Sequence, residues 1–189
     1  MVIDPPLTGE RSYIHGADIF DALLALTGAR QDMVLALRAA SDCAIAVIDG
    51  ATAPDSLACG DFRHRRAGQI RRLLLRRLPD RPIARRSALD DATLAAGATF
   101  ARDGARLPAG GDASFVMRAT ALCLALLERD RPDDYWTLAE IACRRPPPAD
   151  AAVAITVASH VGGRYRKATL AADREPIGHL VLAQGSPRR

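Results

Sequence analysis

Apolar residues recur at helical spacing in two separate segments of the chain. In the segment 16–28, Ile19 and Leu23 fall on one side of a helix, and Gly28 supplies a natural stop. The segment 112–129 is apolar nearly all round, which is typical of a buried central helix. The pattern therefore predicts one amphipathic helix in the first half and one buried helix in the second half.

After the second helix the pattern changes to the alternation of a half-buried strand. Val153, Ile155 and Val157 alternate with smaller or polar residues, a period of two. The dipeptides at 103–104 and 162–163 are expected to form turns. The strands predicted in the second half cover 99–107 as a hairpin, 135–143, 153–158, 165–171 and 177–183.

The first half follows the same plan with weaker signals. Short β-permissive segments lie at 33–38 and 43–48, and 51–60 has the composition of a loop. The segment 68–75 matches 163–170 at an offset of 95 residues, which favours a strand over 69–78.

The shared plan predicts an α+β protein of two units, 1–87 and 88–189. Each unit is expected to contain a helix followed by several antiparallel strands, with the opening strands of the first unit abbreviated. A chain of 189 residues is long enough for two small cores of this kind.

Composition removes several classes of function. The start of the chain has no signal-peptide pattern and no segment is apolar enough to span a bilayer, so we expect a cytoplasmic protein with no membrane partner. The four cysteines and four histidines lack zinc-site spacing, and the phosphate-loop and dinucleotide motifs are absent. The sequence therefore indicates no metal and no cofactor.

The basic residues are unevenly distributed. Of 26 cations, 25 are arginine, and ten of these lie between Arg63 and Arg86 against a single aspartate. Three interpretations stay open: a solvated sheet edge that discourages aggregation, binding of a phosphate or an acidic protein, and binding of nucleic acid. Nucleic acid is the weakest of the three because aromatic residues are only 4% of the chain.

The chain resembles the hotdog fold, in which an antiparallel sheet wraps a central helix, and in particular the bacterial β-hydroxyacyl carrier-protein dehydratases. The similarity rests on R-P-P-P-A-D at 145–150, the alternating strand that follows, the turn at 162–163, the last hairpin, and G-A-D-I-F-D-A-L at 16–23. Two such units would make a double hotdog. The resemblance also leaves association into a homodimer open.

The resemblance implies a set of site residues. Asp21 falls where the family keeps its helical catalytic carboxylate, and His15 is the candidate partner in acid–base chemistry. The Gly16 amide would donate to the thioester oxygen, and Tyr13 would contact substrate.

The resemblance also implies partners and leaves several activities open. Acyl carrier protein or coenzyme A would carry the acyl thioester, and the basic side chains of Arg71, Arg72, Arg76 and Arg77 would bind the phosphate or the carrier. The expected activity is dehydration of a 3-hydroxyacyl thioester. The alternatives are an acyl thioesterase, a non-catalytic binder of acyl ligands or partners, and a nucleic-acid binder that uses the arginines between Arg63 and Arg86.

Overall fold

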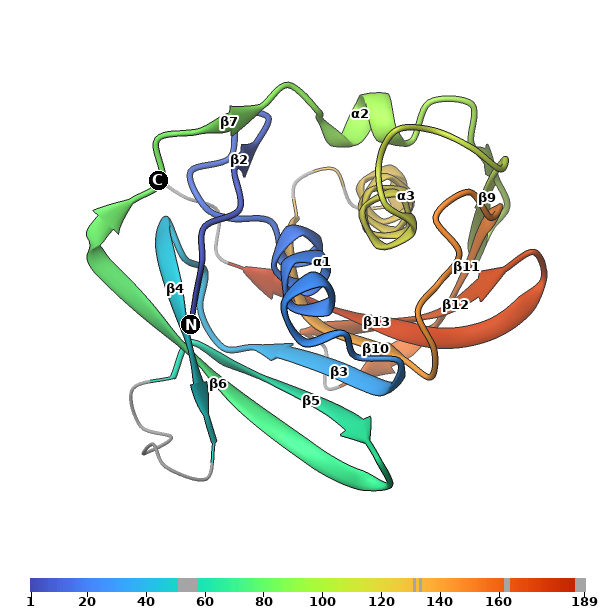
Figure 1. Ribbon diagram of the computed structural model, residues 1–189. Coiled ribbons are helices and arrows are strands. Elements are labelled where there is room, and N and C mark those ends of the chain that lie inside the picture. The colour runs from blue at the N-terminus through green and yellow to red at the C-terminus, as the bar shows by residue number, and fades with distance from the viewer. Residues whose placement is uncertain (51–57, 131, 133, 162–163, 186–189) are drawn as a thin grey trace. The chain divides into compact units, whose positions relative to one another are not determined.

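The computed structural model describes residues 1–50, 58–130, 132, 134–161 and 164–185 (Figure 1). The chain forms two compact units. The first unit comprises Met1–Leu89 together with Glu140–Pro146, and the second comprises Asp90–Ala139 together with Pro147–Arg189. Within the described residues, none of the helices combines the length and the hydropathy that a membrane crossing requires.

The first unit consists of one long helix and a mainly antiparallel sheet. The strand order is β1-β4-β6-β5-β3, with the second half of β10 next to β3. A separate parallel pair is formed by β2 and β7. The elements are β1 (Val2–Ile3), β2 (Leu7–Thr8), α1 (Gly16–Thr27), β3 (Gln31–Leu37), β4 (Cys43–Asp49), β5 (Gly60–Arg66), β6 (Gln69–Pro82), β7 (Arg86–Ser87) and β10 (Tyr135–Cys143).

Helix α1 covers one face of this sheet, and both of its ends are capped. The ring of Phe20 meets Phe62 of β5 edge-on, with 6.1 Å between centroids, and both side chains are fully buried. Gly28 ends the helix in the left-handed conformation with a φ of 61°, and its N–H donates to the Leu24 carbonyl at 2.9 Å. The predicted helix and its stop are confirmed.

The second unit repeats the plan of a long helix followed by antiparallel strands. Its strand order is β10-β13-β12-β11-β9-β8, where β10 contributes its first half. Helix α3 begins after Ser114, whose hydroxyl accepts from the Met117 amide, and most of its side chains are buried. The elements are α2 (Asp91–Leu94), β8 (Thr99–Phe100), β9 (Gly104–Leu107), α3 (Phe115–Asp130), β11 (Val153–Val161), β12 (Tyr165–Ala172) and β13 (Glu175–Gly185).

The predicted strands are present, and the sequence repeat aligns two strands that each lie beside the second strand after the helix of their unit. The predicted turn at 162–163 lies outside the described residues. The match of 68–75 with 163–170 sets β6, the fourth strand after its helix, against β12, the third strand after its helix. In strand order, however, β6 lies between β4 and β5, and β12 lies between β11 and β13, so the two aligned strands have corresponding places in their units.

Strand β6 is interior in the strand order of its sheet. It pairs with β4 on one side and β5 on the other. Leu73–Leu75 pair with both neighbours, whereas Gln69–Arg72 pair with β5 alone and Arg76, Arg77 and Pro82 pair with β4 alone. The arginines of β6 therefore lie where one side of the strand has no pairing among the described residues, so the interpretation as a solvated sheet edge stays open.

Candidate active site

The candidate site begins at the N-terminus of α1, where His15 is the capping residue. Its Nδ1 accepts a hydrogen bond from the Ala17 amide at 3.2 Å, and the residue is 3% exposed. Burial, and then the neighbouring Arg11, lower the pKa of His15 to about 3. The imidazole is therefore neutral near pH 7, with its proton on Nε2, so that it can donate a hydrogen bond but is a weak base.

The carboxylate of Asp18 lies in the first turn of α1. The Thr8 hydroxyl donates to Oδ2 of Asp18 at 2.7 Å, which ties β2 to the helix. Burial raises the pKa of Asp18, and the hydrogen bond from Thr8 and the charge of Arg11 oppose that shift only in part. Asp18 is not among the site residues expected from the sequence, and its partner Thr8 lies ten residues away in the chain.

Asp21 lies one turn further along α1 and is half-buried. Its charge acts on Cys143 of β10, a residue 2% exposed within the same unit. Burial, and then Asp21, raise the pKa of the Cys143 thiol to about 12. Cys143 is thus a protonated thiol at neutral pH and not a nucleophile.

The structure does not pair His15 with Asp21. Six residues separate them on the helix, which is about 9 Å along the axis and about two-thirds of a turn around it. The pKa of His15 is lowered by burial and by Arg11, whereas Asp21 acts on the pKa of Cys143. Each group therefore has its own surroundings, and they do not form a coupled acid–base dyad.

Gly16 and Tyr13 lie beside the helix start. Gly16 is the buried first residue of α1, where the amides of the first turn have no partner within the helix. Tyr13 is half-buried, and the guanidinium carbon of Arg11 lies 6.0 Å from the centre of its ring. Both residues are near His15 in the chain, and their roles toward a substrate stay predictions.

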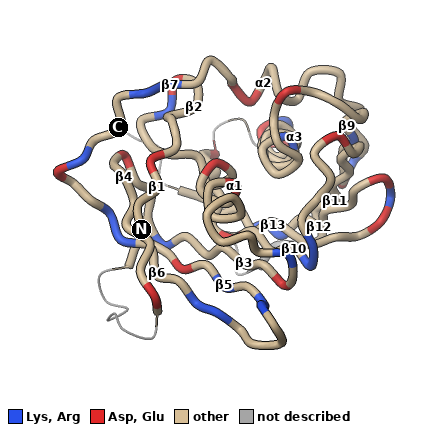
Figure 2. The backbone as a smooth tube through the Cα atoms, viewed as in Figure 1, with Lys and Arg blue, Asp and Glu red and all other residues tan. Residues whose placement is uncertain are grey.

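The four arginines predicted to form a binding group have different surroundings. Arg71 and Arg76 are exposed, and Arg77 pairs with Asp42, whose pKa it lowers. Arg72 instead lies 3.6 Å from Asp61. Figure 2 shows the cations spread along β5 and β6, so alternation along the strands distributes these side chains over both faces.

The arrangement of the cysteine, histidine and acidic side chains bears on metal and thiolate chemistry. Within the described residues, no group of three His, Cys, Asp or Glu side chains could hold a metal ion. The four cysteines are free and buried. Burial raises the pKa of Cys123 in α3 to about 12, so this thiol is protonated at neutral pH.

No protein-family model matches the chain, and no curated protein matches it in sequence. Several solved structures are nevertheless similar. The tesB protein MAP1729c of Mycobacterium avium subs paratuberculosis is 10% identical, with a TM-score of 0.53 over 98% of this chain and 92% of that one. A thioesterase candidate from Novosphingobium aromaticivorans is 13% identical, with a TM-score of 0.51 over 98% and 94%.

The dehydratase domain of RzxB from Pseudomonas fluorescens is 15% identical, with a TM-score of 0.46 over 97% of this chain and 91% of that one. The first two structures have the hotdog fold, and their coverage extends over nearly the whole chain. The predicted hotdog fold is thereby confirmed.

Proposed function

We propose that the chain is a double hotdog that hydrolyses acyl thioesters, with Asp21 as the catalytic carboxylate. Two compact units, each with one long helix followed by four antiparallel strands, support the double hotdog. The proposed units correspond to 1–87 and 88–189, with part of β10 contributed to the first unit. The thioester substrate is proposed by analogy with the Novosphingobium aromaticivorans structure, which shares the fold and is named a thioesterase.

One observation carries the choice of hydrolysis. Asp21 is half-buried on α1 with a protonated thiol beside it, whereas His15 is a neutral helix cap with a pKa of about 3. Dehydration requires one group to remove a proton next to the thioester and another to protonate the departing hydroxyl. Hydrolysis requires only one carboxylate and one donor to the carbonyl oxygen, so the geometry supports it better.

The proposed reaction proceeds through a tetrahedral intermediate. The Asp21 carboxylate takes a proton from a water molecule while the water oxygen attacks the thioester carbon. The negative charge that develops on the carbonyl oxygen is stabilised by the Gly16 amide at the helix N-terminus. The C–S bond then breaks, Asp21 returns its proton to the departing sulfur, and the products are a carboxylic acid and a thiol. Gly16 and Asp21 are separated by about 7.5 Å along the helix axis and by about 140° around it, so the substrate would have to extend around the start of the helix to meet both groups.

His15 and Tyr13 have supporting roles in this proposal. The Nε2–H of neutral His15 and the Tyr13 hydroxyl are donors near the helix start, where they would orient the thioester. The carrier of the thioester is coenzyme A or an acyl carrier protein, and the reaction uses no metal or cofactor.

Release of free thiol from acyl thioesters tests the proposal. The purified chain is incubated with an acyl coenzyme A series, 3-hydroxyacyl forms included, and free thiol is measured with a colorimetric reagent. Asp21→Asn should lower kcat/KM by about 10²-fold or more, because amide cannot accept the proton. Asp112→Asn, an exposed residue before α3, is the matched control and should retain activity.

The same reactions, followed for 2-enoyl products, separate the two chemistries. Enoyl formation without thiol release would assign dehydration and contradict hydrolysis. Undiminished hydrolysis by Asp21→Asn would remove Asp21 from the mechanism. Ligand-dependent melting with no turnover of any thioester would leave a non-catalytic binding protein.

A further inference from the structure

Two adjoining hollows lie on the second unit. Their volumes are about 510 Å³ and about 540 Å³, within the range of small-molecule sites. The first hollow is lined by residues 99–106 and 154–156. The second hollow is lined by residues 97, 99, 106–108, 152–154 and 173–174. All of these residues belong to the second unit, so the hollows share no residue with the candidate active site on α1.

Three residues line both hollows, and they form one row across three paired strands. Thr99 of β8 pairs with Arg106 of β9, and Arg106 pairs with Ala154 of β11. Residues that pair directly across strands point to the same face of a sheet. Because threonine and alanine are short, Arg106 has the only long side chain of these three residues. The row separates the first hollow, on the side of Gly104, from the second hollow, on the side of Pro108.

This row faces away from the core of the second unit. Arg106 is exposed, whereas Leu107, the next residue in β9, is buried. In β11, the half-buried Ala154 follows the buried Val153. Side chains alternate between the two faces along a strand, so Arg106 and Ala154 point to solvent. A dissolved ligand therefore reaches both hollows without displacing any residue of the core.

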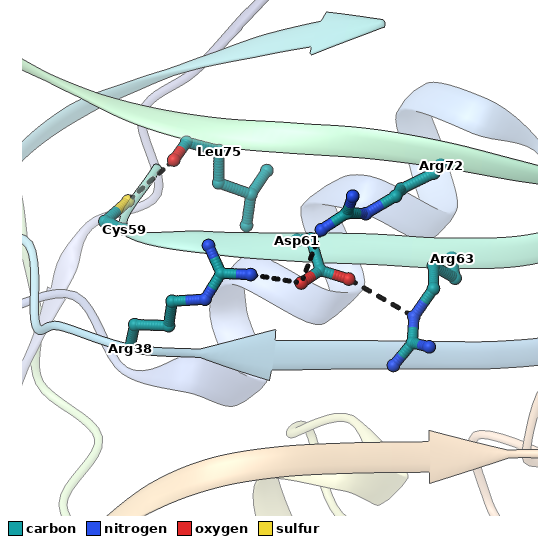
Figure 3. A network of polar contacts seen from close by, with 6 residues as sticks. All are labelled: Arg38, Cys59, Asp61, Arg63, Arg72 and Leu75. Carbon is teal, nitrogen blue, oxygen red and sulfur yellow. Dashed lines mark hydrogen bonds and ion pairs between the residues drawn. The ribbon is translucent and has the colours of Figure 1, made fainter. Parts of the chain in front are cut away.

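Arg106 has no acidic partner among the described residues. In the first unit, by contrast, three arginines surround the buried carboxylate of Asp61, namely Arg38, Arg63 and Arg72 (Figure 3). The guanidinium of Arg106 makes no hydrogen bond or ion pair within the part of the chain that the structure describes. Its five N–H donors, held in a planar fork, are therefore open to an acceptor in either hollow.

Arg174 adds a second cation to the second hollow. It lies with Asp173 in the turn between β12 and β13, where φ is 48° for Asp173 and 75° for Arg174. Arginine is disfavoured in this left-handed region, because its Cβ crowds the backbone. Two hydrogen bonds fix the turn: Oδ1 of Asp173 accepts from the Ala152 amide at 3.0 Å, and the Asp173 amide donates to the Ala152 carbonyl at 3.1 Å. Arg174 is thereby held in the wall of the second hollow.

We infer that the two hollows together bind one amphipathic monocarboxylate. Its carboxylate lies on Arg106 at the side of the second hollow, where Arg174 adds positive potential, and its apolar chain crosses the row into the first hollow. Charge complementarity supports this occupant, because a guanidinium binds a carboxylate through two parallel hydrogen bonds. The methyl groups of Thr99, Ala154 and Thr156 give the chain an apolar floor. The inference goes beyond the proposed hydrolysis and does not depend on it.

A singly charged ligand suits the hollows better than a doubly charged or a neutral one. Each hollow also contains one aspartate, Asp103 in the first and Asp173 in the second. These carboxylates repel a phosphate dianion more strongly than they repel a carboxylate. A neutral ligand brings no opposite charge to Arg106, so it gains no charge-assisted hydrogen bond from an anionic acceptor.

Calorimetric titration with decanoate, kept below its micelle concentration, tests the inference. We expect a decanoate site on the wild-type chain whose affinity Arg106→Gln lowers about tenfold, because glutamine lacks the charge. Decanamide, which has the same chain and no charge, should bind about tenfold more weakly than decanoate. Lys167→Gln is the matched control, since it removes an exposed cation of β12 that lines neither hollow, and it should bind decanoate like wild type.

A second variant tests the path of the apolar chain. Ala154→Tyr fills the row between the hollows and should weaken decanoate binding severalfold. Because Ala154 points to solvent, this variant should keep the wild-type melting temperature. Wild-type affinity for decanoate in either Arg106→Gln or Ala154→Tyr overturns the inference. Equal binding of decanoate and decanamide, or no binding of decanoate by the wild-type chain, overturns it as well.

Two further outcomes also decide the matter. Tighter binding of decyl phosphate than of decanoate overturns the inference in favour of a phosphate site. Loss of one of two decanoate sites in Arg106→Gln supports the inference, because the surviving site then lies outside the hollows. No thioester is present in this titration, so a failure of thioester hydrolysis would be seen separately and would contradict the proposed function alone.

Discussion

Acidification tests whether His15 is buried in its neutral form. In the folded chain its pKa is about 3, against an ordinary value of 6.5. Protonation would place a proton on Nδ1, the atom that accepts from the Ala17 amide. It would also place a positive charge beside Arg11 and at the positive end of the α1 dipole. We therefore expect acid to destabilise the start of α1.

The sign and the size of the change in the free energy of unfolding follow from proton linkage. Because the folded pKa lies below the unfolded one, the unfolded chain binds more protons between pH 6.5 and pH 3. The free energy of unfolding therefore falls as the pH falls through this window, by about 1.4 kcal/mol per pH unit. The whole gap amounts to about 5 kcal/mol, which is comparable to the total stability of many domains.

Other groups titrate in the same range, so a matched variant is needed. Asp18 has a raised pKa, and its contribution has the opposite sign, since the folded chain holds its proton more readily as the pH falls. His15→Asn keeps a good helix cap and removes only the imidazole titration. The difference between wild type and His15→Asn isolates the effect of His15.

Urea unfolding followed by far-UV circular dichroism at pH 7, 6.5, 6, 5.5 and 5 measures this difference. Between pH 6.5 and pH 5 the wild-type chain should lose about 2 kcal/mol more than His15→Asn. Parallel stability curves for the two proteins would refute the argument, because they would mean that His15 titrates equally in the folded and unfolded chains.

Three further predictions concern stability and are measured by chemical unfolding. Arg118→Met should lower the free energy of unfolding by about 2–4 kcal/mol, because the buried guanidinium donates to the carbonyl oxygens of residues 108, 149 and 151 at 2.8–3.2 Å. The control Arg102→Met, at an exposed position, should lower it far less. A Cβ at position 28 would meet no other atom, so the strain there comes only from the φ of 61°, which asparagine tolerates better than alanine. Gly28→Ala should therefore lower the free energy of unfolding by about 1 kcal/mol and Gly28→Asn by less, and equal losses would contradict this reason. Phe62→Ala should cost about 3–5 kcal/mol and Phe62→Leu clearly less, and a cost below 1 kcal/mol for alanine would contradict its burial.

The sequence by itself determined the two long helices and most strands. The apolar spacing of 16–28, the stop at Gly28 and the alternation from Val153 onward depend on neighbours along the chain, so they are visible without a structure. Strand β5 was not predicted, since its charged residues conceal an alternation in which Phe62 and His64 point inward and Asp61 and Arg63 point outward.

Only the tertiary structure decided the strand order and the surroundings of the site residues. Strand β6 is interior because β5 returns to pair beside β3, a choice that involves residues far apart in the chain. Likewise, the capping bond and the neighbouring charge of His15 are local, but its low pKa arises mainly from burial. The ion pair between Arg38 and Asp61 joins residues 23 positions apart. Burial and ion pairing depend on contacts in space, and the order of residues along the chain encodes these only through the complete fold.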